Sequence, residues 1–108
     1  MNNELIPVAL ASSVVKLDHE LEDWNLADAG EDESEPREYT HRVVFDVPFK
    51  TTPVVQVGLT GFDLDQRDSA RLTVGPRAID STGFEIAVAT WNDTRVYGVD
   101  VSWIAIGS

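Results

Sequence analysis

The sequence predicts an all-β protein, a six-stranded antiparallel β-sandwich. Short runs of β-branched and aromatic residues alternate with polar residues, which is typical of strands rather than helices. These runs recur at the regular spacing of an antiparallel sandwich or barrel, with Gly, Pro, Asn and Asp between them. The chain of 108 residues suits one domain. We therefore expect an N-terminal arm over residues 1–11 and one sandwich domain over residues 12–108.

The first third of the chain is predicted to hold one strand and one long loop. In the arm, Pro7 disfavours a helix, and residues 12–17 (SSVVKL) form the first expected strand. Residues 18–38 are polar and acidic, with poor helical spacing. We interpret them as a loop anchored by Trp24. Loops of this length in a small domain are usually functional or disordered.

Three further strands are expected over residues 39–47, 54–62 and 70–79. Gly58 and Gly61 in the second of these predict a bulge or the close approach of another backbone. Pro76 has no N–H to donate, so the strand that contains it is predicted to be bent or to lie at a sheet edge.

The last two strands form a predicted hairpin over residues 83–105, GFEIAVATWNDTRVYGVDVSWIA. Asn92, Asp93 and Thr94 provide the polar turn. Trp91 before the turn and Tyr97 after it are expected to bring two rings near one end of a sheet. Four residues of the second strand are predicted to share one face: Tyr97, Val99, Val101 and Trp103.

Charge and composition exclude several partners. The net charge of −11 argues against nucleic acid and anionic membrane surfaces, since both need clustered Lys and Arg. No apolar run approaches the length of a membrane span. The chain has no cysteine, so no disulfide or thiolate chemistry is available. The first residues lack the basic segment of a secretory signal. The sequence therefore leaves cell-surface, extracellular and cytosolic locations open.

Catalysis has little support, and no enzyme, cofactor or metal site is predicted. The two histidines, His19 and His41, are not in a metal-ligand spacing. Asp63, Asp65 and Asp68 depart from the spacing of an EF-hand calcium loop, so a solvated turn is the better interpretation. A small hydrolase would need two carboxylates with separated pKa values, and no pair stands out.

Sugar recognition has more support. A pyranose presents paired hydroxyls and one apolar face, so its binding site needs a planar hydrogen-bonding group and an aromatic ring on rigid strands. Arg71 offers a fork of donors, Trp91 and Tyr97 offer rings, and an aspartate between residues 28 and 34 offers acceptors. Taken singly, Trp91 is more typical of a core and Arg71 of a salt bridge. The combination favours a site.

The hairpin also carries a family resemblance. TGF precedes its first strand, TW-x-x-T-x-V-Y surrounds its turn, and V-S-W-I-A ends it. In these motifs, and over residues 37–105, the chain resembles the H-type lectin domain, found in snail agglutinins and at the C-terminus of discoidins. The resemblance implies a sandwich that binds carbohydrate and forms homotrimers, with sugar sites in the clefts between protomers.

By this resemblance, Arg71, Trp91 and Tyr97 fall on sugar-contacting positions. In the family the long loop supplies a Gly and an Asp, for which the nearest candidates are Gly30 and Asp32. Ser34 or Asp28 are alternatives for the same role. Asn92 stands where the snail agglutinin has a His, which changes the group facing an N-acetylgalactosamine. Residues 92–94 are also a glycosylation sequon.

Two functions from different classes follow. The first is a multivalent lectin for a terminal galactose or N-acetylgalactosamine type of sugar. The alternative is a trimeric structural or adhesion module, such as a phage or cell-surface spike, without retained sugar binding. Because the chain has no cysteine, the disulfide-linked hexamer of the snail protein is excluded, whereas a non-covalent trimer is not.

Overall fold

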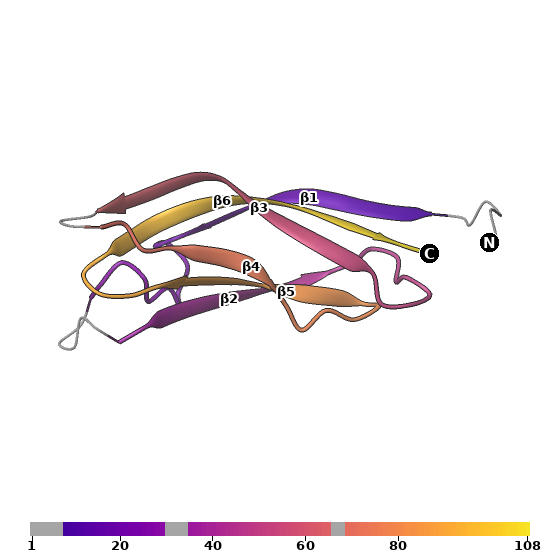
Figure 1. The fold of residues 1–108 in the computed structure, drawn as a ribbon, viewed down its shortest axis with the longest axis horizontal. Helices are drawn as coiled ribbons and strands as arrows, with labels where there is room; N and C mark the ends of the chain where they lie inside the picture. Colours follow the sequence, from indigo (N-terminus) through magenta and orange to yellow (C-terminus); the bar gives the residue numbers. More distant parts are fainter. Residues whose placement is uncertain (1–7, 30–34, 66–68) are drawn as a thin grey trace.

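A computed structural model describes residues 8–29, 35–65 and 69–108. Within these ranges no residue is helical, so no helix there is long and apolar enough to cross a membrane. The regular structure of the described chain is six strands (Figure 1): β1 (Ala9–Asp18), β2 (Arg37–Val44), β3 (Val54–Asp65), β4 (Thr73–Arg77), β5 (Gly83–Thr90) and β6 (Arg95–Gly107).

The strands form two three-stranded antiparallel sheets that face each other (Figure 1). Sheet A has the order β1-β6-β3, and sheet B has the order β2-β5-β4. The final hairpin is thus divided between the layers, with β5 at the centre of sheet B and β6 at the centre of sheet A. The predicted six-stranded antiparallel sandwich is confirmed.

The core lies between the two central strands. Phe84 and Ile86 of β5 and Val101 of β6 are fully buried. The Phe84 and Trp103 rings meet edge to face with centroids 5.2 Å apart, and Phe45 lies 5.8 Å from Trp103. Such aromatic pairs favour this geometry and bury large apolar areas. The apolar residues that alternate along β5 and β6 therefore form the interior of the sandwich.

The observed strand limits differ modestly from the expected ones. β1 begins at Ala9, so residues 9–11 of the expected arm pair with β6, whereas residues 1–7 lie outside the described residues. β2 ends at Val44, and Val47 is exposed. β4 is shorter than the expected strand and holds Pro76 at a sheet edge, as predicted.

Two bulges interrupt the pairing of β3 with β6. Leu59 pairs with Val101 and Gly61 with Asp100, which leaves Thr60 extra. The predicted bulge is therefore confirmed at Gly61, where an added Cβ would lie 2.8 Å from the side-chain Oδ2 of Asp100.

The second bulge corrects the predicted face of Tyr97. Asp63 pairs with Gly98 and Leu64 with Val96, which leaves Tyr97 as the extra residue. Val96 and Val99 are buried while Tyr97 is half-exposed, because the bulge breaks the period-two alternation. Tyr97 therefore does not share the inner face of Val99, Val101 and Trp103.

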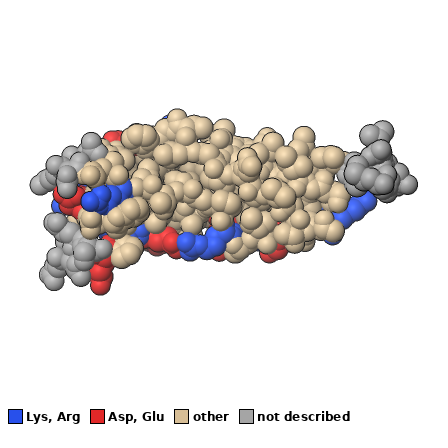
Figure 2. Space-filling model, viewed as in Figure 1, with Lys and Arg blue, Asp and Glu red and all other residues tan. Residues whose placement is uncertain are grey.

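The outer faces of the two sheets differ in character. In sheet A, Leu10, Ile106 and Val54 lie directly opposite one another on three strands and are all exposed. Cross-strand partners share a face of the sheet, so these residues form a continuous apolar row. In Figure 2 most of the upper edge, formed by β1, β3 and β6, is uncharged. Along the lower edge, formed by sheet B, acidic and basic side chains alternate.

Candidate functional site

Three segments that are distant in sequence meet at one end of the sandwich, on the left in Figure 1. They are the loop after β1, the segment 69–72 before β4, and the turn 91–94 that joins β5 to β6. Asn92 in this turn has a φ of 58°, in the left-handed region that Asn tolerates better than most residues. The conformation of this short turn therefore places Trp91 and Asn92 at the tip of the hairpin.

Arg37 joins the long loop to this turn. Its Nη1 donates to the backbone oxygens of Leu26 and Asp28, at 3.4 and 2.5 Å. Its Nη2 donates to the backbone oxygens of Asn92 and Thr94, at 2.9 and 2.7 Å. The planar guanidinium can reach two segments at once because its donors form a rigid fork. One side chain thereby connects both segments that carry predicted sugar contacts.

Thr90 and Thr94 hold the backbone of Arg71. Both threonines are fully buried. Thr90 Oγ1 donates to the Arg71 carbonyl oxygen at 2.5 Å, and Thr94 Oγ1 accepts from the Arg71 N–H at 3.2 Å. Thr94 Oγ1 also donates to the Ser69 carbonyl oxygen at 3.2 Å. The segment 69–71 is therefore fixed to the hairpin although it forms no strand itself.

Trp24 anchors the loop after β1, as expected. Its Nε1 donates to the Val96 carbonyl oxygen at 2.8 Å, and its ring lies 5.1 Å from that of Tyr39. The Val96 N–H donates to the Leu26 carbonyl oxygen at 2.7 Å. Both main-chain groups of Val96 in the hairpin are thus bonded to the loop, one to Trp24 and one to Leu26. Leu26 is fully buried.

Tyr97 lies in a different environment from Trp91. Its ring meets that of His19 edge to face at 6.2 Å, and its carbonyl oxygen accepts from the His19 N–H at 2.9 Å. Beside it is an open cavity of about 250 Å³. The cavity combines aromatic rings with charged groups: Lys16, Asp18, His19, Phe62, Asp63, Tyr97 and Asp100.

The predicted site residues are thus only partly brought together. Arg71 and the turn with Asn92 are joined through Thr94. Asp28, the alternative loop candidate, is joined to Asn92 through Arg37. Within the described chain Trp91 takes part in no ring pair, whereas Tyr97 pairs with His19. The predicted contacts Gly30 and Asp32, and the alternative Ser34, lie outside the described residues.

Sequence reasoning assigned no role in holding the site to Arg37 or to the two buried threonines. Their partners are mostly main-chain groups, which every residue possesses, so no motif marks them. The side chain of Arg71 is half-exposed, yet its Nε–H is buried without an acceptor among the residues described.

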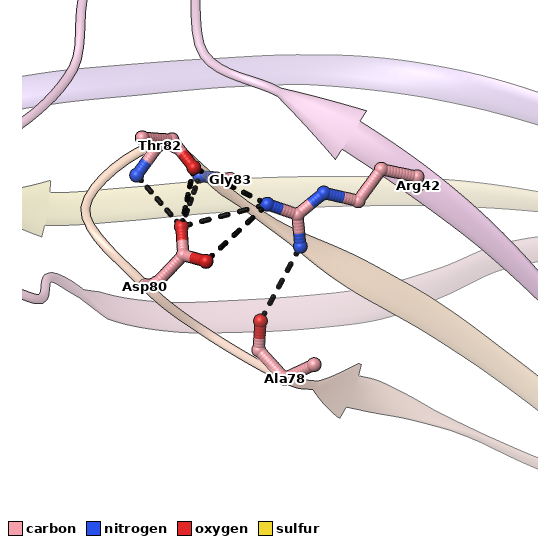
Figure 3. Close-up of polar contacts among 5 residues, drawn as sticks. All are labelled: Arg42, Ala78, Asp80, Thr82 and Gly83. Carbon is pink, nitrogen blue, oxygen red and sulfur yellow. Dashed lines mark hydrogen bonds and ion pairs between the residues drawn. The ribbon is translucent and has the colours of Figure 1, made fainter.

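Among the described residues, the carboxylates with clearly displaced pKa values lie on β2 and in the β4–β5 turn. Hydrogen bonds from the side chain and backbone of Thr82, supported by the Gly83 N–H and Arg42, lower the pKa of Asp80 to about 2 (Figure 3). A hydrogen bond from Arg77 lowers the pKa of Glu38. Among the described residues no group of three His, Cys, Asp or Glu is placed to hold a metal ion.

Two three-stranded antiparallel sheets packed face to face define the class of a small β-sandwich domain. The chain belongs to the H-type lectin domain family, whose model matches residues 40–106. Its general class is therefore that of a carbohydrate-binding lectin domain.

Two curated relatives are similar over much of the domain. "ATP synthase subunits region ORF 7" of Fuscovulum blasticum is 45% identical over 73 residues, covering 68% of this chain and 64% of that protein. One of the discoidin-1 polypeptides of Dictyostelium discoideum is 34% identical over 70 residues, covering 64% of this chain. The match spans only 28% of that discoidin's length.

A solved structure supports the fold. Wild-type discoidin II of Dictyostelium discoideum superposes with a TM-score of 0.77 over 93% of this chain and 36% of that chain. Its sequence identity over the superposed residues is 21%. At this identity the likeness establishes the sandwich architecture alone.

Proposed function

We propose that this protein is a lectin for a terminal galactose or N-acetylgalactosamine type of sugar, bound at the β5–β6 turn end of the sandwich. The observation that carries the proposal is the fixed position of Arg71 beside the turn that presents Trp91 and Asn92, through Thr90 and Thr94. This arrangement occurs in a chain that belongs to a lectin family.

The chemistry of these groups suits a pyranose. The Arg71 guanidinium has donors for vicinal hydroxyls, and a half-exposed Trp91 ring can stack on the apolar sugar face. Asn92 supplies an amide, which pairs with a hydroxyl or an acetamido group. Tyr97 and the loop candidates Gly30, Asp32 and Asp28 would complete the site from the same end, or from a neighbouring protomer.

Assembly as a homotrimer is the second part of the proposal. The apolar row of Leu10, Ile106 and Val54 lies on the outer face of sheet A, and Ile104 extends it. Exposed apolar patches rimmed by polar groups commonly mark interfaces. A small domain also gains core area by burying such a face. Each sugar contact is expected to be weak, so three sites per particle would strengthen binding through avidity.

The interface is tested with two matched valines. Val54 on sheet A and Val44 on sheet B are each 67% exposed. We expect Val54→Lys to reduce the mass in solution from trimer to monomer in light scattering, whereas Val44→Lys leaves the trimer intact. A monomeric wild type, or equal effects of both changes, would contradict the proposed interface.

The sugar site is tested on a glycan array. Arg71→Ala and Trp91→Ala are expected to weaken binding to galactose-type glycans at least about tenfold while the assembly persists. Arg77→Ala, which alters an exposed arginine of sheet B, is the control. Unchanged binding in both site variants would reject the assigned site. A trimer that binds no glycan would favour the structural or adhesion module. Such a module would need only the apolar face of sheet A, through which it would assemble.

A further inference from the structure

We propose that Arg37, Thr90 and Thr94, here called the clasp, are positioning residues that set the geometry of the sugar site without touching the sugar. This inference rests on the proposed lectin function. It concerns what holds Arg71 and the turn in register, rather than which groups contact the ligand.

The two threonines fix Arg71 from both sides of its backbone. Thr94 Oγ1 receives the Arg71 N–H, and Thr90 Oγ1 donates to the Arg71 carbonyl oxygen. With both main-chain groups bonded, the direction in which the Arg71 side chain leaves the backbone is determined by the hairpin. Segment 69–71 has no ladder of its own to supply this constraint.

Thr94 also connects the threonine contacts to Arg37. Its hydroxyl bonds segment 69–71, while its carbonyl oxygen accepts from Arg37 Nη2 at 2.7 Å. The other end of the Arg37 guanidinium bonds the backbone of Leu26 and Asp28. Loop, turn and Arg71 segment thus form one connected hydrogen-bond network. A shift of one member is transmitted to the others.

Burial separates this role from direct ligand contact. Thr90 and Thr94 have an exposed fraction of 0%, so neither hydroxyl can reach a sugar from solvent. Any loss of affinity on removing these hydroxyls must act through the groups that they hold. Binding sites lose much of their affinity when supporting hydrogen bonds leave their contact residues about 1 Å out of place.

Paired substitutions separate the hydroxyl from the methyl group. Thr94→Val keeps the shape and removes the hydroxyl, whereas Thr94→Ser keeps the hydroxyl. We expect Thr94→Val to weaken binding of methyl α-N-acetylgalactosaminide about tenfold and Thr94→Ser to stay within about threefold of wild type. The same contrast is expected at position 90, with weaker binding in Thr90→Val and near wild-type binding in Thr90→Ser. Thr40→Val, an exposed threonine of β2, is the control and should bind as wild type does.

Arg37 is tested in the same assay against Arg42, the second arginine of β2. Arg37→Lys keeps the charge but replaces the fork by a single ammonium, and we expect about tenfold weaker binding. Arg42→Lys makes the same change at an arginine that bonds the β4–β5 turn, and it should leave binding unaltered.

Amide hydrogen exchange without sugar provides an independent readout. In Thr94→Val the Arg71 N–H loses its acceptor, so its exchange should accelerate about tenfold or more, while amides in the centre of β5 keep the wild-type rate. An unchanged Arg71 exchange rate would overturn the inference even if affinity fell.

The outcomes distinguish this inference from the function beneath it. If wild type binds sugar and Arg71→Ala abolishes binding, but the Val and Lys variants bind normally, the clasp has no positioning role and the lectin function stands. If the Ser variants lose as much affinity as the Val variants, packing rather than hydrogen bonding is responsible, and the inference is wrong. If wild type binds no glycan, the proposed function fails and the inference falls with it.

Discussion

The two arginines of β2 lie towards opposite ends of the sandwich and bond to different kinds of groups. Arg37 is half-buried and donates to main-chain oxygens of two distant segments. Arg42 is exposed and donates to the side chains of Asp80 and Thr82 and to the Ala78 carbonyl oxygen (Figure 3). The same residue type thus joins remote segments at one end and braces a single turn at the other.

The two ends differ in what closes the turn beside each arginine, because Arg42, like Arg37, bonds groups far away in the sequence, at separations of 36, 38 and 40 residues. The Arg37 bonds to Asn92 and Thr94 span 55 and 57 residues. The turn at the other end is closed mainly by Asp80, whose Oδ1 accepts from Thr82 and Gly83 only 2 and 3 residues away. These local bonds fix the shape of the turn, and the Phe45 and Phe49 N–H groups attach it to the segment after β2 by donating to the carbonyl oxygens of Thr82 and Ser81. The site end depends on contacts made only when the whole sandwich has formed.

The largest expected effect is at the locally closed end. A Cβ on Gly83 would lie 2.1 Å from the Val43 carbonyl oxygen, so Gly83→Ala forces the backbones of β5 and β2 apart. We expect the free energy of unfolding to fall by about 3 kcal/mol, measured by urea denaturation at fixed protein concentration. Gly75→Ala is the control, since no atom lies within 4 Å of its Cβ. Equal stability of the two variants would contradict the close approach.

Next in size is a direct comparison of the two arginines. Arg37→Met removes donors from carbonyl groups at a partly buried end, and we expect unfolding to become easier by about 2 kcal/mol. Arg42→Met should shift the urea midpoint little, because exposed polar pairs contribute little to stability. If Arg42→Met destabilised as much as Arg37→Met, the two ends would not differ as described.

Acid titration should reveal the turn at Asp80. Its pKa is about 2 in the folded chain against 3.8 as the ordinary value, so its hydrogen bonds stabilise the fold fully above pH 3.8. This contribution is lost as the pH falls from 3.8 towards 2. Asp80→Asn should therefore flatten the pH dependence of the unfolding midpoint in this window. A wild-type slope that survives the substitution would place the responsible carboxylate elsewhere.

The smallest effect is expected for the pair of Arg77 and Glu38. Both groups are exposed, with their atoms 2.5 Å apart, so solvent and salt screen the interaction. Arg77→Gln should leave the thermal midpoint nearly unchanged at high salt (about 0.5 M NaCl) and lower it slightly at low salt. A large change at high salt would show that Arg77 does more than pair with Glu38.

The same contrast explains what the sequence can predict. Alternation along β5 and the later part of β6, Pro76 at an edge and the bulge at Gly61 are local signals, and the structure confirms each. The predicted face of Tyr97 is wrong because one extra residue in a bulge reverses the alternation without changing composition. The role of Arg37 escapes sequence reasoning because backbone oxygens accept its bonds, and these carry no residue-specific pattern. The assignment of Gly30 and Asp32 to the sugar-contacting positions of the loop stays a prediction.

The most direct test of the central claim is a ¹⁵N NMR titration of the assigned protein with methyl α-N-acetylgalactosaminide. The lectin proposal predicts that shift changes gather at the Trp91 indole N–H, the amides of residues 91–94 and the Arg71 amide. The opposite turn over residues 78–83 should remain unperturbed. Changes concentrated at that opposite turn, or none at saturating sugar, would contradict a carbohydrate site at this end of the sandwich.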